Sequence, residues 1–307
     1  MKEFIYPEEK REIKFIKTDT LNIAYEESGE IHAFPIILLH GFPYDPRSWD
    51  KVVPDLVSKG YRVLVPYLRG YGQTSFLDPQ IERTGEQAAI GQDLIDFTSM
   101  LGIDEYAVSG YDWGNRAACI ASVLEPQKIK AMVSINGYAI QNTLKRQSPS
   151  TGLQTSRLWY QWYFHTEQGR TGLEKYRHSI IRHLWETWSP TWNYDDESYN
   201  SSAPSFENPD FVDVVLHSYR HRHMNAPGEK RFLELEKMLA SGPVIDVPTI
   251  VLRGKDSGFG TPTEDPTEDN RNFNRLIDRI IVAQAGHDLP VQRPDAVIDS
   301  ITRLLGD

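Results

Sequence analysis

Residues 106–116 read Tyr106-Ala107-Val108-Ser109-Gly110-Tyr111-Asp112-Trp113-Gly114-Asn115-Arg116. A short apolar run meets Gly110, turns through Asp112 and leaves through Gly114 into a segment typical of a helix. This is the layout of a nucleophile elbow, a tight turn from strand to helix that exposes one reactive side chain. Glycines suit both ends of such a turn because neighbouring elements crowd it. The stretch therefore predicts a strand–turn–helix unit with Asp112 at its tip.

The residue at the tip decides the chemistry. The usual elbow sequence is Gly-x-Ser-x-Gly, and here an aspartate takes the place of the serine. A carboxylate with an ordinary pKa of ~3.9 is already ionised at neutral pH and needs no base to activate it. It can displace a leaving group from a saturated carbon and form an ester, which water must then cleave. The alternative interpretation of Asp112 is a helix cap, since aspartate favours that position.

Composition limits the classes of protein to consider. The chain has 307 residues, of which 39% are hydrophobic and 25% charged, as in a soluble globular protein with a sizeable core. The net charge of −10 argues against nucleic acid and anionic membranes as partners. No apolar run reaches the ~18 residues that a membrane span needs. We predict no cofactor, and a homodimer is left open.

Two further features concern the cellular compartment. Residues 1–10 lack an apolar centre and carry acids, so we expect no secretory signal and a cytoplasmic location. The single cysteine, Cys119, excludes an internal disulfide and a cysteine metal cluster. Because Cys119 lies in an apolar helical run, we interpret it as a buried structural thiol.

Strands and helices alternate through most of the chain. Apolar runs predict strands at 21–26, 35–41, 61–66, 106–110, 129–137, 249–252 and 279–283. Helical spacing predicts helices at 47–59, 84–101, 115–124 and 295–305. This alternation indicates right-handed βαβ units, and so an α/β protein with a mainly parallel sheet flanked by helices.

The alternation stops in the middle of the chain. Between about 140 and 242 there is no convincing strand, and aromatic-rich helices are predicted at 155–165, 173–188, 210–223 and 230–239. We therefore predict a core in two parts, 1–139 and 243–307, with a helical cap inserted at 140–242. The acidic loop 261–270 is interpreted as solvated surface.

Polar residues after two predicted strands complete a catalytic constellation. Ligands gather at the carboxyl ends of the strands in such sheets, where Asp256 and His287 each follow a strand. The order Asp112, Asp256, His287 matches the nucleophile, acid and base of the α/β-hydrolase arrangement. Alone, Asp256 could be a turn former and His287 a loop residue. The other position for the acid holds Asn136, which carries no charge.

Ester cleavage also needs donors for a developing oxyanion. The backbone N–H after the nucleophile, at Trp113, is one candidate. The other is the N–H of Phe42 in His40-Gly41-Phe42-Pro43, which ends a predicted strand. Each such donor typically contributes ~3 kcal/mol to the transition state. A plain turn at the end of a strand is the alternative for this second stretch.

Together these motifs resemble α/β-hydrolases with an aspartate nucleophile, and most of all epoxide hydrolases. The similar stretches are His40-Gly41-Phe42-Pro43, Arg69-Gly70-Tyr71-Gly72, Asp112-Trp113-Gly114, Lys255-Asp256 and Gly286-His287. In the cap, Tyr160-Gln161-Trp162-Tyr163-Phe164 and Ser218-Tyr219-Arg220 resemble the family segments that carry two ring-opening tyrosines. The resemblance implies hydrolysis of an apolar or aromatic epoxide to a vicinal diol.

The resemblance also implies roles for single residues. Tyr160 and Tyr219 would assist ring opening, because a phenol with an ordinary pKa of ~10 can donate to the alkoxide that forms. Substrate contacts would come from His40, Trp113, Gln161 and Tyr163, and Tyr163 is the fallback for the first tyrosine. The alternative for this aromatic stretch is a stripe in the core of the cap, which we favour for Trp162 and Phe164.

Three other functions stay open. Haloalkane and haloacetate dehalogenases resemble the same core and triad, with Trp113 available to hold a departing halide. The haloalkane family usually has Asn at the position of Phe42. The haloacetate family typically has Arg at the position of Trp113, although Arg116 is nearby. A ligand receptor on the same fold would have a broken triad. The segment His221-Arg222-His223 lacks a clear third metal ligand, so we assign no metal.

Overall fold

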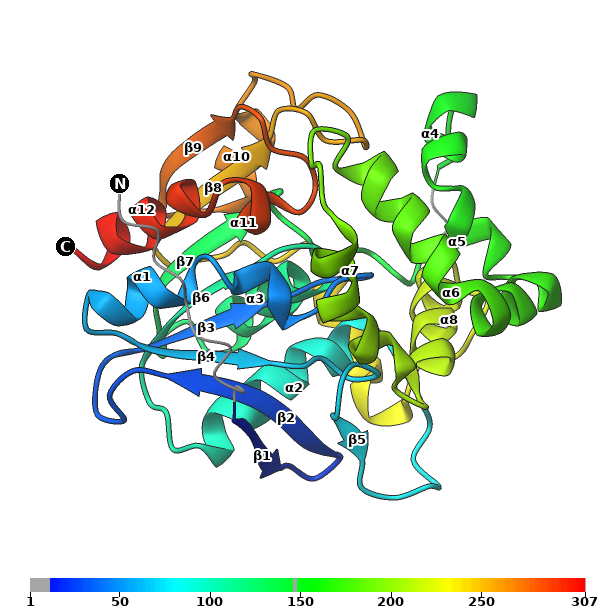
Figure 1. Ribbon diagram of the computed structural model, residues 1–307, viewed down its shortest axis with the longest axis horizontal. Helices are drawn as coiled ribbons and strands as arrows, with labels where there is room; N and C mark the ends of the chain where they lie inside the picture. The colour runs from blue at the N-terminus through cyan, green and yellow to red at the C-terminus, as the bar shows by residue number, and fades with distance from the viewer. Residues whose placement is uncertain (1–11, 146–147, 307) are drawn as a thin grey trace.

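The computed structural model describes residues 12–145 and 148–306. A single β-sheet forms the centre of the fold (Figure 1). The sheet has nine strands in the order β1-β2-β4-β3-β6-β7-β8-β9, with β5 beside β2, in this described part of the chain. Strands β3, β4 and β6–β9 run parallel, and β1, β2 and β5 pair antiparallel. The bounds are β1 Ile13–Lys17, β2 Leu21–Ser28, β3 Pro35–Leu39, β4 Arg62–Pro66, β5 Ser75–Phe76, β6 Tyr106–Gly110, β7 Ile129–Ile135, β8 Thr249–Gly254 and β9 Leu276–Val282.

The parallel strands are buried because helices cover the sheet. Strands β4 and β6 consist entirely of buried residues, which explains their continuous apolar runs. Helix α2 packs on α3, where a side chain at Gly91 would collide with Ile120. Elements of this core are η1 Pro46–Trp49, α1 Val53–Ser58, α2 Gln87–Met100, α3 Trp113–Leu124, α10 Thr267–Asn272, α11 Leu289–Gln292 and α12 Pro294–Leu305. The predicted fold, a mainly parallel sheet flanked by helices, is confirmed.

A group of helices lies between β7 and β8, beside one end of the sheet (Figure 1, green to yellow). Its elements are α4 Gly152–Arg157, α5 Trp159–Tyr163, α6 Glu167–Trp188, α7 Asp196–Ser202, η2 Ala203–Glu207, α8 Phe211–Arg222, η3 Lys230–Phe232 and α9 Leu233–Leu239. The described residues between 140 and 242 contain no strand, as predicted for a helical cap. The domain limits at 139 and 242 stay a prediction, and residues 1–10 lie outside the described part.

Three local predictions were wrong. The predicted helix 47–59 is divided into η1 and α1, because Pro54 lacks the N–H that a continuous helix would use there. Helix α7 was not predicted. The loop 261–270 is not simply solvated, because it leads into α10, where Asp269 is buried and pairs with Arg253 at 2.6 Å and Arg279 at 2.7 Å. The acidic sequence of this loop does not indicate which of its carboxylates is buried.

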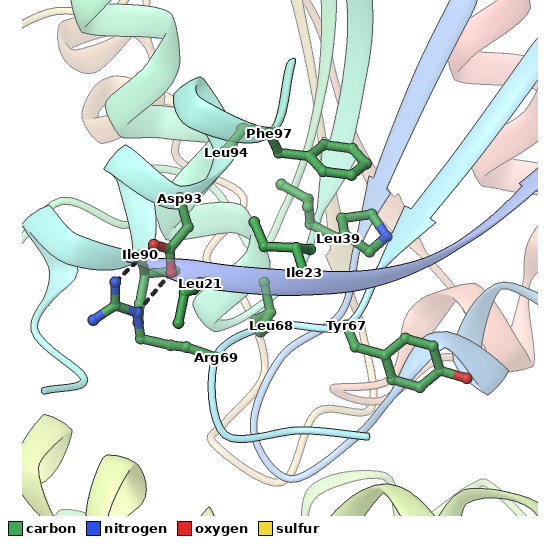
Figure 2. A pocket seen from close by; sticks show the side chains of 11 residues that line it. Leu21, Ile23, Leu39, Tyr67, Leu68, Arg69, Ile90, Asp93, Leu94 and Phe97 are labelled. Carbon is green, nitrogen blue, oxygen red and sulfur yellow. Dashed lines mark hydrogen bonds and ion pairs between the residues drawn. The ribbon is translucent and has the colours of Figure 1, made fainter. Parts of the chain in front are cut away.

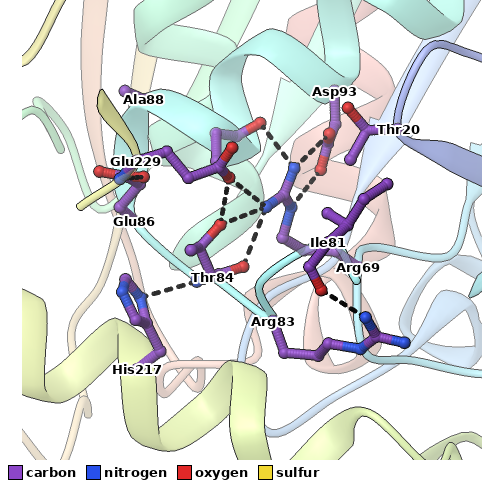
Figure 3. A network of polar contacts seen from close by, with 12 residues as sticks. Thr20, Arg69, Ile81, Arg83, Thr84, Glu86, Ala88, Asp93, His217 and Glu229 are labelled. Carbon is purple, nitrogen blue, oxygen red and sulfur yellow. Dashed lines mark hydrogen bonds and ion pairs between the residues drawn. The ribbon is translucent and has the colours of Figure 1, made fainter. Parts of the chain in front are cut away.

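The glycine-rich loop after β4 is fixed by one buried arginine. Arg69 donates through Nε and Nη2 to the two carboxylate oxygens of Asp93 on α2, at 2.6 Å each (Figure 2). Its Nη1 donates to the carbonyl and hydroxyl of Thr84 and lies 3.9 Å from Glu229 of the cap (Figure 3). An apolar cavity of about 20 Å³ lies beside this pair. Arg69 thus joins the loop, α2 and the cap.

Two other predictions about the chain can be compared with the structure. Cys119 is buried in α3, and burial raises the pKa of its thiol to about 12, as expected for a structural cysteine. None of the helices in the described part of the chain has the length and apolarity that a bilayer crossing requires.

Candidate active site

Asp112 stands at a strained turn between β6 and α3. Its backbone has φ 50° and ψ −119°, in the region that favours glycine. A side chain at Gly114 would lie 2.3 Å from the carbonyl oxygen of Leu39, and one at Gly41 would lie 2.4 Å from Cβ of Asp112. Glycine is therefore required at both positions. The predicted elbow is present, with Asp112 at its tip.

The surroundings of Asp112 keep it ionised. The backbone N–H of Phe42 donates to Oδ1 at 2.9 Å, and Nε2 of His287 lies 3.6 Å from Oδ2. Burial raises the pKa of Asp112. The attraction of the nearby His287, the charge of Arg116 and the Phe42 N–H outweigh burial and hold the pKa below its ordinary value. The carboxylate is therefore available at neutral pH as a nucleophile.

The predicted oxyanion donors flank this carboxylate. The N–H of Phe42 already binds Oδ1. The backbone N–H of Trp113, the first residue of α3, has no acceptor among the described residues. Phe42 stacks on Trp113 with ring centres 5.7 Å apart, which fixes both residues beside Asp112. Both donors can therefore face one oxygen bonded to the Asp112 carboxyl carbon.

His287 follows β9, and aromatic rings hold its side chain. The ring centres of Trp188 and Phe259 lie 5.1 and 5.0 Å from that of His287. Its backbone N–H donates to the carbonyl of Trp188 at 3.1 Å. Nε2, which faces Asp112, is buried and has no hydrogen-bond partner in the part of the chain that the structure describes. A basic nitrogen beside the nucleophile is the geometry that an activating base needs.

Asp256 lies on the same edge of the sheet as His287. Its Oδ2 accepts from the N–H of Gln284 at 3.0 Å, and its own N–H donates to the carbonyl of Ala285 at 2.9 Å. The described residues show no hydrogen bond between Asp256 and His287. The orienting role of Asp256 stays a prediction. Burial raises the pKa of Asp288, the residue after His287, well above its ordinary value.

The two predicted tyrosines meet above Asp112. Tyr160 of α5 and Tyr219 of α8 are buried, with ring centres 5.2 Å apart and planes at 88°. Burial raises the pKa of Tyr160 to about 12, and the charge of Asp112 adds to the effect. Burial also raises the pKa of Tyr219 well above its ordinary value, and the electrostatic effects of Tyr160 and Asp112 add to this increase. Both phenols therefore carry their protons at neutral pH.

Residues predicted to contact substrate have different surroundings. Gln161 donates through Nε2 to the Tyr160 hydroxyl at 3.0 Å and meets His223 with its carbonyl oxygen. Tyr163 is half-buried, with its hydroxyl against Gly172 of α6. His40 is fully buried, and its ring nitrogens contact the carbonyl of Gly41 and the N–H of Leu68. His40 also meets the ring of Tyr71 edge-on, with ring centres 4.9 Å apart. These substrate roles stay predictions.

Aromatic residues enclose the site, including some that the sequence did not indicate. Trp188, at the end of α6, lies 5.1 Å from Tyr160 between ring centres. The indole N–H groups of Trp113 and Trp188 are both buried, and neither has an acceptor among residues 12–145 and 148–306. Phe164 is buried as predicted, whereas Trp162 is 42% exposed, so its assignment to the core of the cap was wrong. Trp188 could not be found because nothing in its neighbourhood of the sequence marks the direction of its side chain.

The histidines of α8 do not face Asp112. His221 lies 3.4 Å from Glu86, and these two residues and Glu236 present ligand atoms within 4.8 Å of one another. His223 contacts Gln161 at 2.9 Å. The acidic neighbours of His221 come from distant parts of the chain, which the sequence alone could not show. The absence of a metal stays a prediction.

Known proteins with similar sequences are epoxide hydrolases. The chain is 34% identical to "Epoxide hydrolase 2" of Siraitia grosvenorii over 133 residues, which cover 43% of this chain and 41% of the relative. It is 28% identical to "Epoxide hydrolase A" of Mycobacterium tuberculosis over 151 residues, 49% of this chain and 45% of that protein. The chain thus spans less than half the length of these curated relatives. The resemblance predicted from the sequence is confirmed.

Solved structures and a family model extend the similarity to nearly the whole chain. A crystal structure of a candidate epoxide hydrolase from Klebsiella pneumoniae is 35% identical, with a TM-score of 0.91 over 95% of this chain and 96% of that one. A laboratory-evolved variant of potato epoxide hydrolase, 20% identical with a TM-score of 0.77 over 97% and 99%, shares the fold. The model of the alpha/beta hydrolase fold matches residues 35–294. Because this model matches most of the chain, and the sheet and the elbow agree with it, the chain belongs to the alpha/beta hydrolase fold family.

Proposed function

We propose that the chain is a hydrolase that opens epoxides to vicinal diols through a covalent ester on Asp112. One observation carries the proposal. The Asp112 carboxylate contacts the Phe42 N–H at 2.9 Å and faces His287 at 3.6 Å, beneath two buried tyrosines. The names of the similar proteins support the same activity.

The first step is ring opening. The Phe42 N–H holds Oδ1 of Asp112, which leaves Oδ2 to attack an epoxide carbon. A C–O bond of the ring breaks as the new ester bond forms, and negative charge develops on the epoxide oxygen. One of the two phenols, Tyr160 or Tyr219, transfers its proton to that oxygen and becomes a phenolate, and the other donates a hydrogen bond to the same oxygen. Acid assistance of this kind typically accelerates a reaction by ~10²–10⁴-fold.

The second step is hydrolysis of the ester. Nε2 of His287 accepts a proton from water, which attacks the carboxyl carbon of the ester. The N–H groups of Phe42 and Trp113 stabilise the oxyanion. The bond between this carbon and the diol oxygen then breaks, and the diol oxygen takes the proton held by His287. The second proton of the water passes to the phenolate, so the tyrosine, His287 and the Asp112 carboxylate are all restored. Asp256 is the proposed orienting acid for His287.

The lining suits an apolar or aromatic small molecule. Rings of Phe42, Trp113, Phe164 and Trp188 surround the tyrosines, so only a few polar groups face the reacting atoms. His40, Gln161 and Tyr163 are proposed as substrate contacts on the resemblance alone. A cytoplasmic location and a homodimer also rest on the sequence predictions.

One observation favours a second candidate, dehalogenation by the same triad. The buried indole N–H groups of Trp113 and Trp188 have no acceptor within the described part of the chain. Two such donors beside a nucleophile could bind a departing halide as readily as an alkoxide. In that reaction the carbon–halogen bond would break when Asp112 attacks. The halide would leave as an anion, so the reaction would need no proton from the tyrosines.

A product assay separates the two candidates. The protein is incubated with styrene oxide and, separately, with 2-phenylethyl chloride, and diol and chloride are measured. We expect diol from the epoxide, no chloride, and loss of at least ~10⁴-fold of the rate in Asp112→Asn. Chloride release without diol would replace the proposal by dehalogenation. Diol formation that persists in Asp112→Asn would contradict the role of Asp112.

A further inference from the structure

A buried imidazole and two buried carboxylates meet where the cap rests on the core. Glu86 directly precedes α2 of the core, whereas His221 lies on α8 and Glu236 on α9. Their side chains belong to residues that are 1%, 8% and 3% exposed. Each residue offers one ligand atom, and the three atoms all lie within 4.8 Å of one another. Three distant parts of the chain therefore bring a set of possible metal ligands to one point.

The distance between two of these atoms suits a metal ion. Nε2 of His221 lies 3.4 Å from Oε2 of Glu86. Oε2 is buried, and it has no hydrogen-bond partner in the described part of the chain. Zinc binds imidazole nitrogen and carboxylate oxygen at about 2.0–2.2 Å, so two of its ligand atoms at a tetrahedral angle lie about 3.4 Å apart. A zinc ion would therefore bond to both atoms at their present separation.

The carboxylate of Glu236 is already oriented by neighbouring donors. Its Oε2 accepts from the hydroxyl of Thr143 at 2.7 Å and from the side chain of Gln87 at 2.9 Å. Its Oε1 accepts from the backbone N–H of Ala88 at 3.1 Å. A carboxylate has about four lone-pair sites, so three hydrogen bonds leave one for a metal. Donors in these positions fix a ligating carboxylate and increase its affinity for the ion.

The charges at this place do not balance. Among the described residues, neither Glu86 nor Glu236 forms an ion pair with a lysine or arginine. A third carboxylate, Glu229, lies beside Glu86 and donates its backbone N–H to Oε1 at 2.7 Å (Figure 3), but it pairs with Arg231. Burial raises the pKa of Glu86 to about 7, and the charges of Glu236 and Glu229 add to the effect. Buried carboxylates without a cation are costly, and one divalent ion would balance two of them.

A cavity gives access to the three ligands. Its volume is about 330 Å³, and Glu86, His221 and Glu236 all line it together with Gly228 of the segment after α8. A side chain at Gly228 would collide with Oε2 of Glu86 and approach Nε2 of His221 to 2.8 Å. Glycine at this position therefore leaves space beside both ligand atoms. A metal ion can enter from the cavity, and a water molecule there can complete its coordination.

We propose that Glu86, His221 and Glu236 bind a zinc ion that fastens the cap to the core. Zinc accepts imidazole and carboxylate ligands, and three protein ligands with one water molecule complete its usual four. Because His221 follows Tyr219 by two residues on α8, the ion would also hold the helix that carries this proposed acid. The proposal replaces the sequence-based prediction of no metal, and it does not depend on the proposed reaction.

Isothermal titration calorimetry tests the site. Zinc chloride is added to the untagged full chain after treatment with EDTA and dialysis. We expect one ion per chain with a Kd below ~1 μM, and binding at least ~100-fold weaker in His221→Gln and in Glu236→Gln, since each variant loses one ligand. His223→Gln is the matched control, because His223 directly follows α8 and contacts Gln161 at 2.9 Å instead. It should bind zinc as the wild-type protein does.

Thermal unfolding checks that the ion stabilises the fold. Free zinc at a hundredfold excess over Kd should raise the Tm of the wild-type protein and of His223→Gln by at least ~3 °C, but not that of His221→Gln. If one ligand variant fails to fold, the other decides. Wild-type binding weaker than ~100 μM would overturn the inference and leave Glu86 protonated instead of metal-bound. Zinc affinity unchanged in a folded His221→Gln or Glu236→Gln would also overturn it, whether or not the protein hydrolyses epoxides.

Discussion

At the scale of single residues, the tyrosines offer the clearest kinetic prediction. Replacing Tyr160 or Tyr219 by phenylalanine should slow formation of the ester by ~10²–10⁴-fold and leave its hydrolysis nearly unchanged, because the phenols act on the epoxide oxygen. Single-turnover rates separate the two steps. Tyr176→Phe, at a residue 65% exposed on α6, is the control. Slower hydrolysis with normal ester formation would show that the tyrosines are wrongly assigned.

The elbow makes a prediction about stability. Gly114→Ala should lower the free energy of unfolding by ~3 kcal/mol or more, because the added methyl group meets the backbone carbonyls of Leu39 and His40 at 2.3 and 2.4 Å. Gly152→Ala is the matched control, since nothing lies within 4 Å of its added methyl group. Urea unfolding measures both. Equal stability of the two variants would contradict this prediction, because it would mean that the backbone around Gly114 can accept a methyl group without a loss of free energy.

The residues predicted from the sequence are those with a local signature. Asp112 has its two glycines within two positions, and His287 directly follows a recognisable strand, so pattern and spacing were enough. Trp188 borders the site for a different reason. Its contacts with the rings of Phe42 and His287 bring its side chain there, and no spacing along the chain encodes those contacts.

At the scale of elements, Asp45 ties the cap to the core and predicts a pH dependence. It precedes η1 and accepts hydrogen bonds from Ser202 and Ser205 of the cap at 2.7 and 2.6 Å. Burial raises its pKa to about 6, although Arg47 opposes the effect. A carboxyl whose pKa is raised on folding stabilises the fold at low pH, and this contribution is lost as the pH rises through 6.

The size of the effect follows from the shift. Between pH 4 and pH 7 the wild-type protein should lose about 2 kcal/mol of unfolding free energy relative to Asp45→Asn, which cannot titrate. Unfolding in urea at both pH values measures the difference between the two proteins. Asp55→Asn, at an exposed position of α1, should show no such change. A constant difference between wild type and Asp45→Asn would contradict the assignment.

The elements themselves were predicted with uneven success. Strands β3, β4 and β6 are buried throughout or nearly so, so their apolar runs stand out. The short elements η1, α7 and α10 carry few apolar residues and depend on tertiary contacts, such as those of Asp269 with two arginines. Sequence patterns detect elements with a strong buried face and miss those that distant partners hold in place.

At the scale of the whole molecule, the core holds the proposed nucleophile and base, and the cap holds the two proposed acids. Asp112 and His287 stand at the ends of parallel strands, and Tyr160 and Tyr219 descend from α5 and α8. The chain order of sheet, cap and sheet was predictable because the helical region interrupts a regular alternation. How the cap rests on the core was not, since it depends on contacts such as the one between Arg69 and Glu229 at 3.9 Å.

The covalent ester on Asp112 is the central claim, and intact-protein mass spectrometry of His287→Ala tests it most directly. Without the base, water attack is slow, so the ester should accumulate during incubation with an epoxide that the wild-type protein hydrolyses. We predict a mass gain equal to the whole epoxide, located on the peptide that contains Asp112. No mass gain in a folded His287→Ala protein, while the wild-type protein forms diol from the same epoxide, would contradict the account.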